Sequence, residues 1–259
     1  MKVVLFCGGQ GTRLREYSDA IPKPLVNVGA RPIVWHLMRY YAHYGHTDFI
    51  LALGYKGHAI RDYFLKYDEC LSNDFVLSNG GKTAQALTTD ISNWRITFVD
   101  TGLQSNIGER LKRVRPHLEG ETEFLANYAD GLSDLPLDRH IADFRKRGAV
   151  ASFAAVASPQ SFHGVHSDDN GVVTSFGRVA DADFWINAGF FCLRQEIFDV
   201  LHDGDELVEQ PFQRLIEQRQ LSVYRHRGFW QAMDTFKDKM SFDSMDEREQ
   251  CPWMVWKKT

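Results

Sequence analysis

Short apolar runs alternate along this chain with segments patterned as helices, and this alternation constrains the fold more than any other feature. Residues 2–7 and 48–53 are apolar and rich in β-branched or large side chains, as in buried strands. Residues 32–44 and 58–67, which follow them in turn, carry apolar side chains at helical spacing. Strands that alternate with helices form a doubly wound, mostly parallel sheet covered on both faces. We therefore expect an α/β fold that binds ligands at the carboxyl ends of its strands.

The remaining pattern extends this arrangement through one domain that spans residues 1–259. A polar, turn-rich segment at about 160–183 predicts a small β-hairpin or lid, with residues 172–176 as one strand. The helical and aromatic tail, 235–259, is expected to pack on the body or on a neighbouring subunit. Further strands are predicted at 94–99, 123–127, 151–156 and 186–193, and further helices at 109–116, 137–147, 195–201 and 211–218.

Charge and composition exclude several classes of partner. The chain has 34 acidic and 30 basic residues and a net charge of −4, so no overall positive field exists to hold a nucleic-acid backbone. Its apolar N-terminal run is too short for a signal-peptide core, and no stretch approaches the roughly 20 apolar residues of a membrane span. We expect a cytoplasmic protein with neither nucleic-acid nor membrane partners. The cysteines lack metal-ligand or disulfide-scaffold spacing and are predicted to be free thiols: Cys7, Cys70, Cys192 and Cys251.

A glycine-rich loop follows the first predicted strand. Gly8, Gly9 and Gly11 let backbone N–H groups approach phosphate oxygens, and Arg13 adds a bidentate cation. On spacing alone, a tight turn explains these glycines equally well, because neither the dinucleotide fingerprint nor the P-loop is matched. Farther along, two prolines flank Lys23 and would present its ammonium group rigidly to a phosphate. A solvated lysine in a proline-rich loop remains the alternative.

Taken together and in order, the motifs of this chain resemble those of the sugar-1-phosphate nucleotidyltransferases, or NDP-sugar pyrophosphorylases, and most nearly the glucose-1-phosphate cytidylyltransferases. The resemblance implies a Rossmann-like sheet of the nucleotide-diphospho-sugar transferase type, a cytoplasmic enzyme of carbohydrate biosynthesis and a homo-oligomer. It also implies a nucleotide or nucleotide sugar and a sugar phosphate as ligands. The motifs lie at residues 8–14, 22–24, 33–36, 54–57, 99–102, 110–114, 128–131, 186–191 and 228–235.

The resemblance also implies a metal site formed by Asp130 and Asp234, with Mg²⁺ as the ion and Mn²⁺ as a substitute. Two aspartates supply the hard oxygen ligands that Mg²⁺ prefers and leave positions for phosphate and water. Without the resemblance, Asp130 suits a turn before Gly131, and Asp234 suits the start of a helix near Thr235.

In such enzymes a sugar-phosphate oxygen attacks the α-phosphorus of a nucleoside triphosphate and pyrophosphate leaves, so catalysis depends on positioning and charge stabilisation. The resemblance gives catalytic roles to Arg13, which would hold the pyrophosphate, to Lys23, which would hold the α-phosphate, and to the two aspartates. It assigns nucleotide binding to Phe6, Gly8, Gly9, Gly11, Thr12, Arg13, Lys23, Arg110, Tyr128 and Asp130. It assigns sugar binding to Asn187, Gly189, Glu209 and Arg178.

One departure from the family pattern stands in the predicted hairpin. A Glu-Lys-Pro motif is expected after Ser175-Phe176, with its lysine on the sugar phosphate, but this chain has Gly177 and Arg178 followed by valine and alanine. A lost charged contact weakens binding by about 1.5–3 kcal/mol. Two alternatives therefore stay open. One is a metal-dependent isomerase or pyranose–furanose mutase that acts on a preformed nucleotide sugar, and the other is a non-catalytic nucleotide-sugar sensor.

Overall fold

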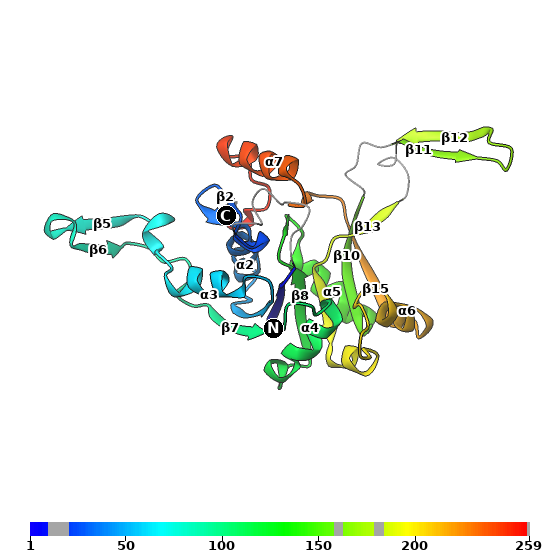
Figure 1. Ribbon diagram of the computed structural model, residues 1–259, viewed down its shortest axis with the longest axis horizontal. Helices are drawn as coiled ribbons and strands as arrows, with labels where there is room; N and C mark the ends of the chain where they lie inside the picture. The colour runs from blue at the N-terminus through cyan, green and yellow to red at the C-terminus, as the bar shows by residue number, and fades with distance from the viewer. Residues whose placement is uncertain (10–20, 158–162, 179–183, 258–259) are drawn as a thin grey trace.

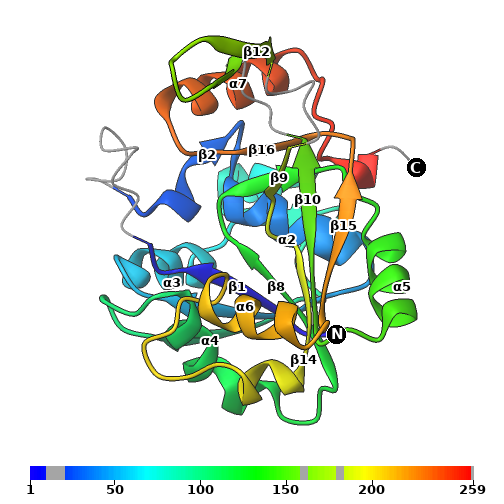
Figure 2. The ribbon, with the colours of Figure 1, turned by 90° about the vertical axis from the view of Figure 1, so that its right-hand side faces the viewer.

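A central eight-stranded sheet organises the molecule (Figures 1 and 2). The computed structural model describes residues 1–9, 21–157, 163–178 and 184–257. The strand order is β13-β10-β14-β8-β1-β4-β7, with β15 paired to β10. The strands are β1 (Val3–Cys7), β4 (Asp48–Leu53), β7 (Arg95–Asp100), β8 (Glu123–Tyr128), β10 (Ala151–Ala157), β13 (Trp185–Asn187), β14 (Phe191–Arg194) and β15 (Leu221–His226).

Parallel pairing dominates the half of the sheet that contains the N-terminal strand. β1 lies between β4 and β8 and is parallel to both, and β7 extends the sheet in parallel beside β4. β14 runs antiparallel to both β8 and β10, and β13 runs antiparallel to β10. The expected α/β fold with a mostly parallel sheet is confirmed. The carboxyl ends of β1, β4, β7 and β8 therefore meet at one edge.

Helices cover both faces of this sheet, as doubly wound folds require. Val3, Leu5 and Cys7 of β1 join one buried cluster, and Val4 and Phe6 join the other. The first cluster includes side chains from α2 (Ile33–His43), α3 (Gly57–Leu65), α5 (Leu137–Arg147) and α7 (Phe236–Glu247). The second includes side chains from α4 (Ile107–Val114) and α6 (Gln210–Glu217).

The predicted strand at 186–193 is wrong in one respect, because the chain turns in its middle. Gly189 has φ +77° and Phe190 has φ +50°, and these left-handed conformations separate β13 from β14. The predicted helix at 195–201 is a short 3-10 helix, Gln195–Asp199. Strand β15, parallel to β10, was not predicted. An apolar run carries no sign of a backbone reversal inside it, which explains the first error.

Two hairpins project from the body in opposite directions in Figure 1. The one expected from the turn-rich segment is present as β11 (His163–Ser167) and β12 (Val173–Arg178), which pair antiparallel. The other, β5 (Phe75–Ser78) with β6 (Thr83–Ala86), had no counterpart in the sequence patterns. Among the helices that the structure describes, none combines the length and the apolar character that crossing a membrane requires.

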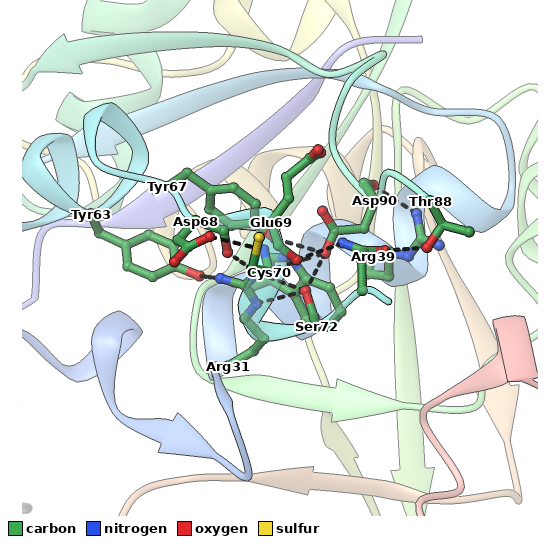
Figure 3. Close-up of polar contacts among 12 residues, drawn as sticks. Arg31, Arg39, Tyr63, Tyr67, Asp68, Glu69, Cys70, Ser72, Thr88 and Asp90 are labelled. Atoms are coloured by element: carbon green, nitrogen blue, oxygen red, sulfur yellow. Dashed lines mark hydrogen bonds and ion pairs between the residues drawn. The ribbon is translucent and has the colours of Figure 1, made fainter. Parts of the chain in front are cut away.

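Buried Arg31 ties down the base of the β5–β6 hairpin (Figure 3). Its guanidinium donates to the backbone oxygen of Asp68 at 2.7 Å and to the hydroxyl of Ser72 at 2.6 Å, both just before the hairpin. The Ser72 hydroxyl in turn donates to Asp90 Oδ2 at 2.6 Å, just after the hairpin, and Tyr67 donates to the same oxygen at 2.8 Å. One buried cation therefore joins both ends of the projecting segment.

Candidate active site

The two predicted metal ligands meet because two short strands pair. β9 (Gly131–Ser133) follows Asp130 directly, and β16 (Trp230–Ala232) ends two residues before Asp234. Their antiparallel register places Ala232 opposite Gly131, and the Met233 N–H donates to the Asp130 carbonyl at 2.8 Å. The backbones that carry both aspartates are therefore held together at the carboxyl end of β8.

Lys23 joins these aspartates in one cluster. Its Nζ lies 2.6 Å from Asp130 Oδ2 and 2.7 Å from Asp234 Oδ1. The lysine side chain is 11% exposed, against 29% for Asp130 and 42% for Asp234. Burial lowers the pKa of Lys23, but the charge and hydrogen bonds of the two carboxylates outweigh it and raise the pKa above its ordinary value. The ammonium group stays charged.

Asp130 and Asp234 fit a divalent cation on the chemistry of their donors. Oxygens from two distant segments already converge on one positive charge, and hard carboxylate oxygens are what Mg²⁺ prefers. Within the described ranges, no group of three or more acidic, histidine or cysteine side chains is placed to hold an ion. Two carboxylates would therefore leave most coordination positions to phosphate and water, as at sites where Mg²⁺ binds with substrate phosphates.

The start of the glycine-rich loop lies over a buried arginine. Gly8 follows β1, and its carbonyl accepts hydrogen bonds from the Tyr55 N–H at 3.2 Å and from Arg110 Nη2 at 3.1 Å. A Cβ on Gly8 would lie 2.1 Å from Arg110 Nη1, so a larger residue at this position would displace the guanidinium group. Gly9 is exposed. Gly11, Thr12 and Arg13 lie outside the described residues.

Arg110 lies beside Gly8, where it is 3% exposed. Its Nη1 donates to the Leu53 carbonyl at 3.2 Å, the Thr101 hydroxyl at 2.7 Å and the Gly102 carbonyl at 2.9 Å. Together with Gly8, these acceptors follow or end three neighbouring strands. The structure therefore places Arg110 as a brace under the site.

Phe6 and Tyr128 stand near the ends of β1 and β8, with ring centroids 6.3 Å apart. Burial, with a further contribution from the charge of Glu206, raises the pKa of Tyr128 to about 12. The Glu206 carboxylate accepts a hydrogen bond from the Ile107 N–H at 3.3 Å, and burial raises its pKa. Glu206 had no motif to mark it in the sequence.

The predicted sugar-binding residues lie on three separate elements. Asn187 ends β13, and its Oδ1 accepts the Gly189 N–H at 2.9 Å, which closes a tight turn. Glu209 is exposed and precedes α6. Arg178 ends β12 in the projecting hairpin, and its side chain lies outside what the structure describes.

Asn127 is a further polar residue of this region that sequence reasoning missed. It is buried in β8, and its Oδ1 accepts the Phe190 N–H at 3.0 Å. A Cβ on Gly189 would lie 2.4 Å from that oxygen. A single polar residue within the apolar run 124–128 was the available signal, because a buried amide needs a partner.

Known proteins match this chain over nearly its whole length. A family model described as nucleotidyl transferase matches residues 2–238. The chain is 38% identical over 258 residues to a protein of Bacillus subtilis (strain 168) named as a probable glucose-1-phosphate cytidylyltransferase, which covers 99% of this chain and 100% of the relative. It is 36% identical, with the same coverage, to the glucose-1-phosphate cytidylyltransferase of Salmonella typhi.

Solved structures share the fold. HddC from Yersinia pseudotuberculosis superposes with a TM-score of 0.67 at 20% identity, covering 95% of this chain and 99% of that one. A UDP-glucose pyrophosphorylase complexed with UDP-glucose superposes with a TM-score of 0.69 at 16% identity, covering 96% and 98%.

Proposed function

This chain belongs to the nucleotidyl transferase family and is a sugar-1-phosphate nucleotidyltransferase, and we propose that it joins CTP and glucose 1-phosphate into CDP-glucose with Mg²⁺ as its metal. Mn²⁺ would substitute. One oxygen of the sugar phosphate forms a bond to the α-phosphorus, and the bond to the β-phosphate bridging oxygen breaks, which releases pyrophosphate. The base and the sugar are carried over from the names of the full-length relatives.

The observation that carries this proposal is the convergence of Lys23, Asp130 and Asp234. The nucleophile is a phosphate oxygen that is already anionic at neutral pH, so no side chain need remove a proton from it. When bound, Mg²⁺ neutralises negative charge on the phosphates. Asp130 and Asp234 would hold that ion, and Lys23 would place its ammonium group against the α-phosphate. The backbone N–H groups of Gly8 and Gly9, together with the guanidinium group of Arg13, would position the remaining phosphates.

Residues near β12, β13 and α6 would recognise the sugar. Asn187 and Gly189, at the turn between β13 and β14, and Glu209 before α6 would contact hydroxyl groups. Arg178 would contact the sugar phosphate in place of the missing lysine. An arginine presents a planar fork of donors where lysine presents a point charge, so this phosphate would be held in a different geometry.

A mutase or isomerase reaction on a finished nucleotide sugar is the second candidate, and the absence of the expected Glu-Lys-Pro lysine after Ser175-Phe176 is what favours it. Both reactions would use the same metal ligands. Only transfer releases pyrophosphate, whereas conversion of an added nucleotide sugar does not.

The test is pyrophosphate release from CTP and glucose 1-phosphate, measured with Mg²⁺ and with EDTA. We expect metal-dependent release, and we expect Asp130→Asn and Asp234→Asn each to lower kcat/KM by about 100-fold or more. Asp169→Asn, in the turn of the β11–β12 hairpin, is the matched control and should leave kcat/KM unchanged. Conversion of added CDP-glucose without pyrophosphate release would support the mutase reaction.

We also propose that the chain forms a homo-oligomer. Phe75 and Leu77 of β5 are 43% and 60% exposed on a hairpin that, among the residues the structure describes, forms a two-stranded sheet of its own. Such an isolated hairpin is marginally stable in water, and its apolar side chains gain stability when another surface covers them.

A further inference from the structure

The position of Lys23 indicates a second role for this side chain besides contact with a phosphate. Its ammonium nitrogen donates to two carboxylates that lie 107 and 211 residues away along the chain, and the two distances differ by only 0.1 Å, 2.6 against 2.7 Å. Magnesium–oxygen bonds measure about 2.0–2.1 Å. A metal ion bound to both oxygens would therefore stand almost where Nζ stands, and two cations so close repel each other strongly.

We propose that Lys23 is a stand-in cation: it positions Asp130 and Asp234 in the free enzyme and excludes a divalent ion until a nucleotide phosphate draws its ammonium group away. This inference rests on the proposed function for the identity of the nucleotide. It makes Lys23 a positioning residue for the metal ligands, and it couples metal binding to nucleotide binding.

The backbone around Lys23 is held in place, so only the lysine side chain need move when its ammonium group leaves the aspartates for a phosphate. Lys23 opens a 3-10 helix between two prolines, and the Val26 N–H donates to its carbonyl at 3.0 Å while the Leu25 N–H donates to the Pro22 carbonyl at 2.8 Å. The proline rings restrict the backbone further. The four-carbon side chain is then the part that can swing between carboxylates and phosphate.

The aspartates stay in place when the lysine leaves. Asp130 is fixed through the β9–β16 pair, where its carbonyl accepts the Met233 N–H at 2.8 Å. The Asp234 N–H donates to Asp238 Oδ2 at 3.1 Å, in the turn that starts α7, where Thr235 and Asp238 form a capping box. Withdrawal of the ammonium group would therefore remove one positive charge from between two carboxylates that lie side by side, and such a pair of carboxylates attracts a divalent ion.

The test is a titration of the protein with Mn²⁺ in the absence of substrate. The electron paramagnetic resonance signal of free Mn²⁺ measures how much of the ion remains unbound. We expect Lys23→Met to bind Mn²⁺ at least tenfold more tightly than the wild type. The control Lys82→Met, on the exposed β5–β6 hairpin, should match the wild type. The double variant Lys23→Met/Asp234→Asn should lose the gain, which locates it at this site. An Mn²⁺ affinity of Lys23→Met equal to or below that of the wild type would overturn the inference.

A second measurement tests the coupling. With a non-hydrolysable CTP analogue at saturation, the Mn²⁺ affinity of the wild type should rise by at least tenfold more than that of Lys23→Met, because the variant's site is already open. The intrinsic affinity of the analogue for Mn²⁺ is common to both proteins and cancels. An equal gain in the two proteins would refute the coupling. The substrate-free titration is independent of transfer, so absence of pyrophosphate release would contradict the proposed function and leave this result standing.

Discussion

Among single residues, Arg110 shows how a buried charge organises the site edge. Its guanidinium reaches the Gly8 carbonyl after β1, the Leu53 carbonyl at the end of β4, and the Thr101 hydroxyl just after β7. Those three strands are neighbours and parallel, so one side chain ties their carboxyl ends together. Five donors in a rigid fork suit this position, and a lysine ammonium has only three.

We expect Arg110→Met to destabilise the protein by about 2–4 kcal/mol and to weaken CTP binding by about tenfold or more. The buried carbonyls would lose their donor, and the Gly8 backbone would lose its support. Arg110→Lys should recover only part of either loss. Urea unfolding and calorimetric titration with CTP measure the two effects, and Arg95→Met, an exposed arginine at the start of β7, is the control. Unchanged CTP affinity in Arg110→Met would show that the brace is not needed for binding.

Among the elements, α2 and the C-terminal tail are held together by an imidazole. His36 Nε2 lies 2.9 Å from the Val28 carbonyl, and the Trp253 indole N–H donates to His36 Nδ1 at 3.4 Å. Trp253 is almost fully buried against Phe229 and Phe242. The tail therefore packs on the body of its own chain, and these contacts require a neutral imidazole with its proton on Nε2.

The pH dependence of stability follows from that imidazole. Burial lowers the pKa of His36 from 6.5 to about 4, so the unfolded chain takes up a proton in this range before the folded one does. Stability is thus full above pH 6.5 and falls as the pH drops toward 4, by about 2 kcal/mol at pH 5. His140, also buried, acts in the same direction with a pKa of about 4.

Urea unfolding at pH 7.5 and 5.0 checks this prediction. His36→Gln should be less stable than the wild type at pH 7.5 but should lose about 2 kcal/mol less on going to pH 5.0. His166→Gln, on the exposed β11–β12 hairpin, should follow the wild type at both values. If His36→Gln and the wild type lose the same stability, the imidazole at this position is not what makes the fold acid-sensitive.

At the scale of the whole molecule, the β5–β6 hairpin is a large apolar feature outside the core. It projects from the body beside α3 (Figure 1), and Arg31 fixes its base through Ser72 and Asp68 (Figure 3). A rigid base under an apolar ribbon suits a surface that a second copy of the chain covers, because less conformational entropy is then lost on association.

We expect the double variant Phe75→Lys/Leu77→Lys to reduce the proposed oligomer to a smaller species in light scattering after gel filtration. Two buried lysines would face apolar surface without partners, which disfavours association. Ile216→Lys, an exposed apolar position on α6, should leave the mass unchanged. A double variant with the wild-type mass would remove this hairpin from the interface.

Local pattern was enough for much of this protein. The alternation of strands and helices predicted the parallel sheet, and residues 137–147 were predicted as a helix with the bounds that α5 has. The ordered motifs predicted the family. Each of these features depends on neighbours in the sequence, because propensity, amphipathic spacing and turn residues act over a few positions.

Other features depend on segments that meet only after folding. The pairing of β9 with β16 brings Asp130 to Asp234, and neither three-residue strand has a pattern of its own. The turn at Gly189 and the burial of Arg110 likewise follow from what the rest of the fold places beside them. Strand pairing and burial are set by contacts distant in sequence, which a local pattern does not encode. Residue types therefore identified the candidates for the site, while the tertiary structure decided which of them lie together.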